Sequence, residues 1–265
     1  MNPPAAVWSC TTGPEHVPGR GDVVLVHGSL DRSAGMLRLS RQLDSAWRVT
    51  RYDRRGYGRS GPHPGPFTLD AQIADLAELI ERTAPAPVVV FGHSFGGNVA
   101  LGVADRHPQL VRAVAVYESP LSWIDWWPTD SAGGAAALVA SDPAAAAEAF
   151  MRRLIGDHRW QRLPESSRAA RRSEGPAMLA ELADLRRGAP WQPERIGVPV
   201  LTLFGERGRP HHRRAMEWVA DAVPDGRAHV VPGAHHFGPN SHAEVVAGLL
   251  KGFLETTAVA STPSS

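Results

Sequence analysis

The chain has 265 residues and a mass of 28.5 kDa, so it can bury a full hydrophobic core in one domain, with space for an inserted subdomain. A hydrophobic content of 43% excludes a wholly disordered chain, and a net charge of +1 argues against nucleic acid or an anionic membrane as an obligate partner. The single cysteine, Cys10, excludes a disulfide within the chain.

Six short apolar runs rich in β-branched residues alternate with helical patterns along the chain. The runs are 23–27, 48–53, 87–91, 113–117, 199–204 and 228–232. Apolar side chains on both faces are typical of central strands of a parallel sheet. Between and after them, 69–80 and 245–253 carry apolar residues at helical spacing. The alternation predicts an α/β fold with a mostly parallel central sheet and helices on both faces.

The segment between the fourth and fifth runs, residues 121–194, contains no strand-like run and is rich in helix formers. It is far longer than an ordinary connection, so we expect a helical cap inserted before the last two strands. The core then comprises 1–120 and 195–257, and the small, polar tail 258–265 is predicted to be disordered.

A serine stands at the end of the third run, in PVVVFGHSFGGNVAL, with Ser94 between Gly92 and Gly96. A G-x-S-x-G sequence between a strand and a helix is typical of a nucleophile elbow. The serine needs a strained backbone there, and a side chain at either glycine would clash with neighbouring elements. The alternative is a tight strand–helix turn with an incidental serine.

Four motifs together resemble the α/β-hydrolase family over nearly the whole chain. They are VVLVHGS, YDRRGYGRS, GHSFGG and VVPGAHHFGP, in the order found in that family. The resemblance implies a serine hydrolase with Ser94 as nucleophile. It also implies an oxyanion hole formed by the backbone N–H groups of Ser29 and Phe95. Because only 22 residues precede the first long run, the family's N-terminal hairpin is expected to be short or partly missing.

The stretch GYGRSG, residues 56–61, also fits the dinucleotide-binding pattern G-x-G-x-x-G. That pattern must lead directly into a helix, whereas PHPGPF follows here, and its prolines are incompatible with a helix interior. We interpret the stretch as a loop and expect neither a nucleotide nor another organic cofactor.

A base must take the serine proton, and the doublet His235–His236 after the last strand is the best candidate among 12 histidines. The family pattern at this turn resembles G-x-G-H, which assigns the base to His236. His235 replaces a glycine of that pattern and remains the alternative. A metal site made of this doublet and His211–His212 lacks an accompanying carboxylate-rich pattern, so no metal is expected.

The triad acid is missing from its usual place. The family carries an aspartate in a stretch resembling G-x-x-D, but this chain reads FGERGRP, with Gly208 at the acid position. Glu118 ends an apolar strand, where an unpaired carboxylate is costly to bury, and α/β active sites form at such strand ends. Glu206 lies among arginines that offer it an ordinary surface ion pair. We therefore favour Glu118 over Glu206, with a purely structural Glu118 as the third possibility.

A cluster of tryptophans follows Glu118 in SPLSWIDWWP, where the insertion begins. Tryptophans there either pack in the core of the cap or line a substrate pocket. The residues expected at the pocket are His27, Leu30, His93, Trp123 and Trp127, and for the two histidines a structural or hydrogen-bonding role is the default. Nine arginines against five acidic residues between 152 and 187 favour either an anionic substrate or a solvated helix face.

The predicted activity is hydrolysis of an ester, thioester or lactone with a largely apolar acyl group, through an acyl-enzyme on Ser94, His236 and Glu118. A perhydrolase, lyase or C–C bond hydrolase on the same triad, or a non-catalytic binding protein, are the alternatives. The N-terminal MNPPAAVWSCTTGPEH lacks the parts of a signal peptide, and AGGAAALVA is too short to cross a bilayer. We therefore expect a cytoplasmic protein that acts on a small molecule.

Overall fold

The computed structural model describes residues 7–15, 22–85 and 87–259. A seven-stranded sheet with the order β1-β3-β2-β4-β5-β6-β7 forms its centre, and each neighbouring pair is parallel except β1 with β3. The strands are β1 (Ser9–Thr12), β2 (Val23–Val26), β3 (Val49–Tyr52), β4 (Val88–His93), β5 (Val111–Tyr117), β6 (Val200–Gly205) and β7 (Gly226–Val231). The prediction of an α/β fold with a mostly parallel sheet is confirmed.

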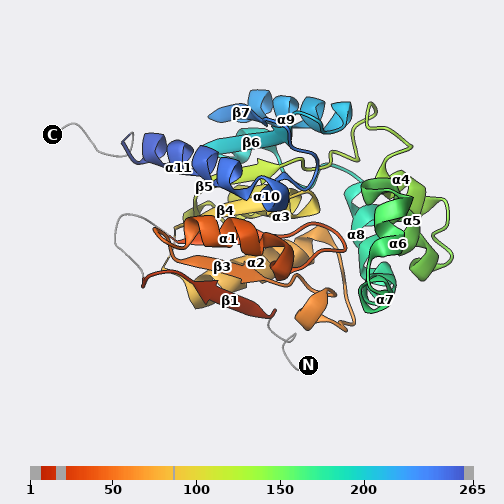
Figure 1. Ribbon diagram of the computed structural model, residues 1–265. Helices are drawn as coiled ribbons and strands as arrows, with labels where there is room; N and C mark the ends of the chain where they lie inside the picture. The colour runs from red at the N-terminus through yellow and green to blue at the C-terminus, as the bar shows by residue number, and fades with distance from the viewer. Residues whose placement is uncertain (1–6, 16–21, 86, 260–265) are drawn as a thin grey trace.

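Helices cover both faces of this sheet (Figure 1). The helices outside the insertion are α1 (Leu37–Leu43), α2 (Leu69–Thr83), α3 (Phe95–Arg106), α9 (Pro210–Ala222), α10 (Gly238–Ser241) and α11 (Ala243–Val259). Alternate strand residues explain the two layers. Val24 and Val26 join the cluster of α2, α3 and α9, whereas Val23 and Leu25 join that of α1 and α11.

Each of the six predicted strands is present with its ends within two residues of the prediction. The short edge strand β1 was not predicted because its sequence, SCTT, has no apolar run. The tail prediction is wrong for Ala258 and Val259, which belong to α11. The rest of the predicted tail, 260–265, lies outside the described residues.

Between β5 and β6 the chain forms five α-helices, which we call the cap. They are α4 (Ala132–Ala137), α5 (Pro143–Ile155), α6 (Asp157–Arg162), α7 (Glu165–Ser173) and α8 (Gly175–Leu185). The cap forms a separate group of helices beside the sheet (Figure 1). Its buried side chains, such as Phe150, Trp160 and Met178, join the same hydrophobic cluster as α2 and α3. Core and cap therefore share one apolar interior.

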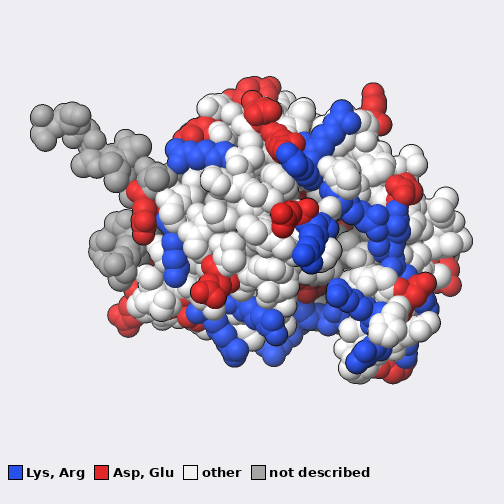
Figure 2. All heavy atoms as spheres, turned by 45° about the horizontal axis from the view of Figure 1, so that its top comes forward, with Lys and Arg blue, Asp and Glu red and all other residues white. Residues whose placement is uncertain are grey.

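The cap surface carries many ion pairs. Blue and red side chains are interspersed over it in Figure 2, and Arg153 pairs with Asp130 at 2.5 Å. Further pairs join Arg152 and Arg172 to Glu148, Arg168 to Glu165 and Arg187 to Asp184. Exposed pairs of this kind contribute little stability. Much of the arginine excess of the cap therefore forms a solvated surface rather than an anion site.

None of the helices within the described residues combines the length and the apolar character needed to cross a bilayer.

Candidate active site

Ser94 lies between the last residue of β4 and the first residue of α3, with φ 53° and ψ −126°. Such a positive φ is strained for a residue with a side chain. The elbow is also crowded. A Cβ on Gly92 would lie 2.4 Å from the carbonyl oxygen of Gly96, and one on Gly96 would lie 2.5 Å from that of His27. Both glycines are therefore required for the turn that presents Ser94 at the start of a helix.

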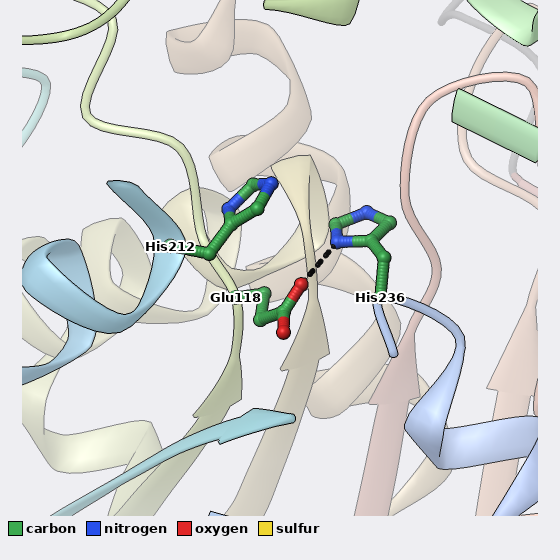
Figure 3. A group of neighbouring side chains, drawn as sticks. All are labelled: Glu118, His212 and His236. Atoms are coloured by element: carbon green, nitrogen blue, oxygen red, sulfur yellow. Dashed lines mark hydrogen bonds and ion pairs between the residues drawn. The ribbon is translucent and has the colours of Figure 1, made fainter. Parts of the chain in front are cut away.

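Glu118 directly follows β5 and is fully buried, also with a positive φ of 47°. Its two carboxylate oxygens have separate partners. Oε1 accepts a hydrogen bond of 2.9 Å from the backbone N–H of Gly205, and Oε2 lies 2.7 Å from Nδ1 of His236 (Figure 3). A carboxylate bound to Nδ1 fixes the orientation and the tautomer of an imidazole.

The loop that carries His236 is fastened to the ends of β4 and β5. The hydroxyl of Tyr117 donates to the carbonyl oxygen of His235 at 2.8 Å, and Nε2 of His93 donates to that of His236 at 2.8 Å. Burial and the neighbouring His236 lower the pKa of His93 to about 3, so its ring is neutral at pH 7. These bonds fix the position of the His236 backbone relative to Ser94 and Glu118.

The alternative base and the alternative acid lie elsewhere. His235 is exposed, and its Nδ1 donates to the carbonyl oxygen of Arg207 at 2.7 Å. Glu206 is also exposed, and its carboxylate accepts a 2.7 Å hydrogen bond from the backbone N–H of Gly233. Each forms a local surface bond, whereas Glu118 and His236 bond to each other.

A cavity between core and cap brings most of these groups together. Ser29, Ser94, Phe95 and His236 line one part of it, and Trp127, Phe150, Leu154 and Leu182 form an apolar wall. Arg153, Arg209, His211 and His212 also lie at its surface. Both residues expected to supply oxyanion donors thus line the same cavity as Ser94.

The structure places four of the five expected pocket residues away from this lining. His27 is buried, and its Nδ1 donates to the carbonyl oxygen of Gly28 at 2.8 Å. Leu30 packs in the core, and His93 holds the His236 loop as described above. Trp123 packs edge-on against Trp191, with ring centroids 5.7 Å apart. Each of these four residues is packed or hydrogen-bonded within the protein. Of the five expected residues, only Trp127 lines the cavity.

One residue beside the site was not predicted as part of it. His212, in the first turn of α9, stacks on His236 with ring centroids 4.8 Å apart and lies beside the Glu118–His236 pair in Figure 3. Burial and the nearby His236 lower its pKa well below the usual range, so His212 is neutral. Glu118, His212 and His236 each offer a possible ligand atom, and these atoms lie within 4.8 Å of one another. Among the described residues, this is the group of side chains that could hold a metal ion.

Curated relatives and solved structures share these features of sequence and fold. The chain is 29% identical over 255 residues to the pimeloyl-[acyl-carrier protein] methyl ester esterase of Chromobacterium violaceum. The alignment covers 91% of this chain and 97% of that protein. It is 36% identical over 100 residues, 38% of each chain, to lipase LipV of Mycobacterium tuberculosis. A thermophilic esterase from Thermogutta terrifontis superposes with a TM-score of 0.74 at 23% identity, over 95% of this chain and 94% of that chain.

A family model adds the final comparison. The model described as the alpha/beta hydrolase family matches residues 23–249, which run from β2 into α11. The match therefore includes strands β2 to β7, the elbow, the cap and the histidine loop. The resemblance seen in the four sequence motifs is confirmed, and the chain belongs to the alpha/beta hydrolase family.

Proposed function

We propose that the chain is a serine hydrolase that cleaves an ester, thioester or lactone of a small to medium, largely apolar acyl group. One observation carries the proposal: the buried Glu118 bonds at 2.7 Å to His236, which lines the same cavity as Ser94. The names of the curated relatives, a methyl ester esterase and a lipase, support the choice of an ester bond.

The side chains divide the chemistry between them. Ser94 Oγ attacks the acyl carbon while His236 takes its proton and then gives it to the leaving group. Because Glu118 engages Nδ1, the other ring nitrogen of His236 is the one that exchanges protons with Ser94. The carboxylate stabilises the imidazolium that forms. Water activated by the same histidine then releases the acyl group from Ser94.

The negative charge that develops on the carbonyl oxygen needs hydrogen-bond donors. The backbone N–H groups of Ser29 and Phe95 fill this role in the proposal, and the first turn of α3 adds a partial positive charge. The acyl group lies against the apolar wall formed by Trp127, Phe150 and Leu182. A small-molecule ester is thus the expected partner.

Two measurements test the proposal. Purified protein is treated with a fluorescent fluorophosphonate, and hydrolysis of p-nitrophenyl acetate, butyrate and octanoate is followed. We expect rapid labelling and turnover in the wild type, and loss of both in Ser94→Ala, because only an activated serine reacts quickly. A folded wild-type protein that resists the label and hydrolyses none of the esters would contradict the proposal and favour a non-catalytic binding protein.

A further inference from the structure

A single buried carboxylate of the cap connects it to the catalytic half of the molecule. Glu181, on α8, is fully buried. It accepts hydrogen bonds from the hydroxyls of Ser29 at 2.5 Å and Tyr57 at 2.6 Å, from Arg54 at 2.7 Å and from Gln72 at 3.1 Å. All four donors belong to the core. The hydrogen bonds of this one cap side chain therefore all cross the boundary between cap and core.

The charge of Glu181 is balanced by Arg54, which is itself only 1% exposed. Burial lowers the pKa of this guanidinium, but the charge of Glu181, its hydrogen bond to Arg54 and the nearby tyrosines together raise the pKa above its ordinary value. A buried carboxylate is tolerated only with such a partner, so Arg54 and Glu181 depend on each other. Undocking the cap would separate them.

The same two residues hold the loop that carries the expected oxyanion donor. The backbone N–H of Arg54 donates to Nε2 of His27 at 2.9 Å, and its Nε donates to the carbonyl oxygen of His27 at 2.9 Å. Glu181 binds the hydroxyl of Ser29, two residues further on. Leu30, the next residue, has φ 52°, a strained conformation that must be maintained by its surroundings.

We propose that Glu181 is a positioning residue for the oxyanion hole. It acts through the Ser29 hydroxyl and through Arg54, so the Ser29 N–H points at the reacting oxygen only while the cap is docked. This inference rests on the proposed hydrolase function. In this arrangement the cap does more than form the apolar wall of the cavity, because it also completes the catalytic geometry of the core.

Two substitutions of Ser29 separate positioning from folding. Ser29→Ala keeps the backbone N–H but removes the hydroxyl that Glu181 holds, whereas Ser29→Thr keeps a hydroxyl at the same place. Complete removal of an oxyanion donor costs about 100- to 1000-fold in rate, and a misplaced donor should cost part of that, about tenfold. We expect Ser29→Ala to lower kcat on p-nitrophenyl butyrate by about tenfold with little change in KM, and Ser29→Thr to recover most of the loss.

A pair of inhibitors gives a readout that a merely structural role would not change. An alkyl trifluoromethyl ketone forms a hemiketal with the serine and places an oxyanion in the hole, while the matching methyl ketone binds without that charge. Ser29→Ala and Glu181→Gln should raise the Ki of the trifluoromethyl ketone by the same factor as they lower kcat, and leave that of the methyl ketone nearly unchanged.

Glu174→Gln is the matched control. Glu174 is also a buried cap carboxylate bound to the core, and its hydrogen bonds go to Arg32 at 2.7 Å and to the N–H of Gly58 at 3.0 Å rather than to Ser29 or Arg54. This variant should keep the wild-type ratio of the two Ki values.

The outcomes are separable. Ser29→Ala with wild-type kcat and wild-type inhibitor affinity would overturn the inference while leaving the hydrolase function intact, and this result does not depend on whether Glu181→Gln folds. A wild-type protein that neither hydrolyses the ester nor binds the trifluoromethyl ketone would overturn the proposed function and this inference with it.

Discussion

Glu118 occupies the space that a side chain at position 208 would need. A Cβ added to Gly208 would lie 2.4 Å from Oε1 of Glu118 and 2.9 Å from the carbonyl oxygen of Gly205, both closer than real Cβ atoms approach. Position 208 is where the family's acid was expected from the sequence. Gly208 therefore leaves free the space that Glu118 fills. An aspartate at position 208 would clash with the glutamate after β5.

Removal of the acid should reduce turnover much more than removal of its competitor. In Glu118→Gln the carboxylate that orients His236 is lost, and we expect kcat on p-nitrophenyl butyrate to fall by about a thousandfold or more. In Glu206→Gln only a surface bond to Gly233 changes, so kcat should stay within about twofold. Equal losses in the two variants would refute the assignment of Glu118.

The acid should be transferable between the two positions. Gly208→Asp alone forces a side chain and a second carboxylate against Glu118, so the free energy of unfolding should fall by about 1–3 kcal/mol. Glu118→Ala removes the closer of the two clashes and leaves only the 2.9 Å approach to the carbonyl oxygen of Gly205. The double variant Glu118→Ala/Gly208→Asp should therefore have a kcat about tenfold or more above that of Glu118→Ala alone. The double variant Glu118→Ala/Gly208→Ala fills the same space without a charge. If that control recovers as much activity, the recovery does not come from the acid.

The two adjacent histidines should differ sharply in importance. His236→Ala removes the proposed base, so we expect kcat to drop by about a thousandfold or more. His235→Ala removes an exposed ring bound to the carbonyl oxygen of Arg207, which should change kcat by less than about threefold. Both values come from initial rates with the same ester. The reverse order of losses would move the base to His235.

Stability should decrease on acidification because of buried neutral histidines. The pKa of His93 in the folded state is about 3, below the ordinary value near 6.5 of an unfolded chain. Between these values the unfolded state binds a proton that the folded state does not, so the free energy of unfolding decreases as the pH falls. One such group contributes a slope of up to about 1.4 kcal/mol per pH unit.

His93→Asn keeps a donor for the carbonyl oxygen of His236 but cannot titrate. Urea unfolding at pH 7, 6 and 5 should therefore show a shallower loss of stability in this variant than in the wild type. His158→Asn, which replaces an exposed histidine of α6, is the control and should keep the wild-type slope. Parallel slopes for wild type and His93→Asn would rule out a buried neutral His93.

Local sequence was sufficient to predict strands β2 to β7 and the residues at their ends, but not the edge strand β1. Apolar runs fix the strands, and parallel strands bring their carboxyl ends to one edge, so Ser94 after β4 and Glu118 after β5 had to be neighbours. The glutamate was identifiable because a carboxylate that ends an apolar strand needs a buried partner. His236 was chosen over His235 from the family pattern, since nothing in the doublet itself distinguishes the two rings.

Contacts between segments far apart in the chain were not predictable in this way. The stacking of His212 on His236 depends on how α9 docks, and the bond of Glu181 to Ser29 joins residues 152 positions apart. One signal for Glu181 was present: in GPAMLAELADL it lies on the face that buries Met178, Leu182 and Leu185. A carboxylate within an apolar helical stripe predicts a buried partner, but not which partner.

The position of Glu118 directly after β5 has a consequence for the connection between β6 and α9. In this molecule that connection does not supply the carboxylate bound to His236, and its last residue, Arg209, lines the cavity together with His211 of α9. Variation there can alter which acyl groups are accepted without disturbing the pairing of acid and base. In the proposed mechanism the residues that contact the acyl group after β6 are thus separate from the carboxylate after β5 that orients the base.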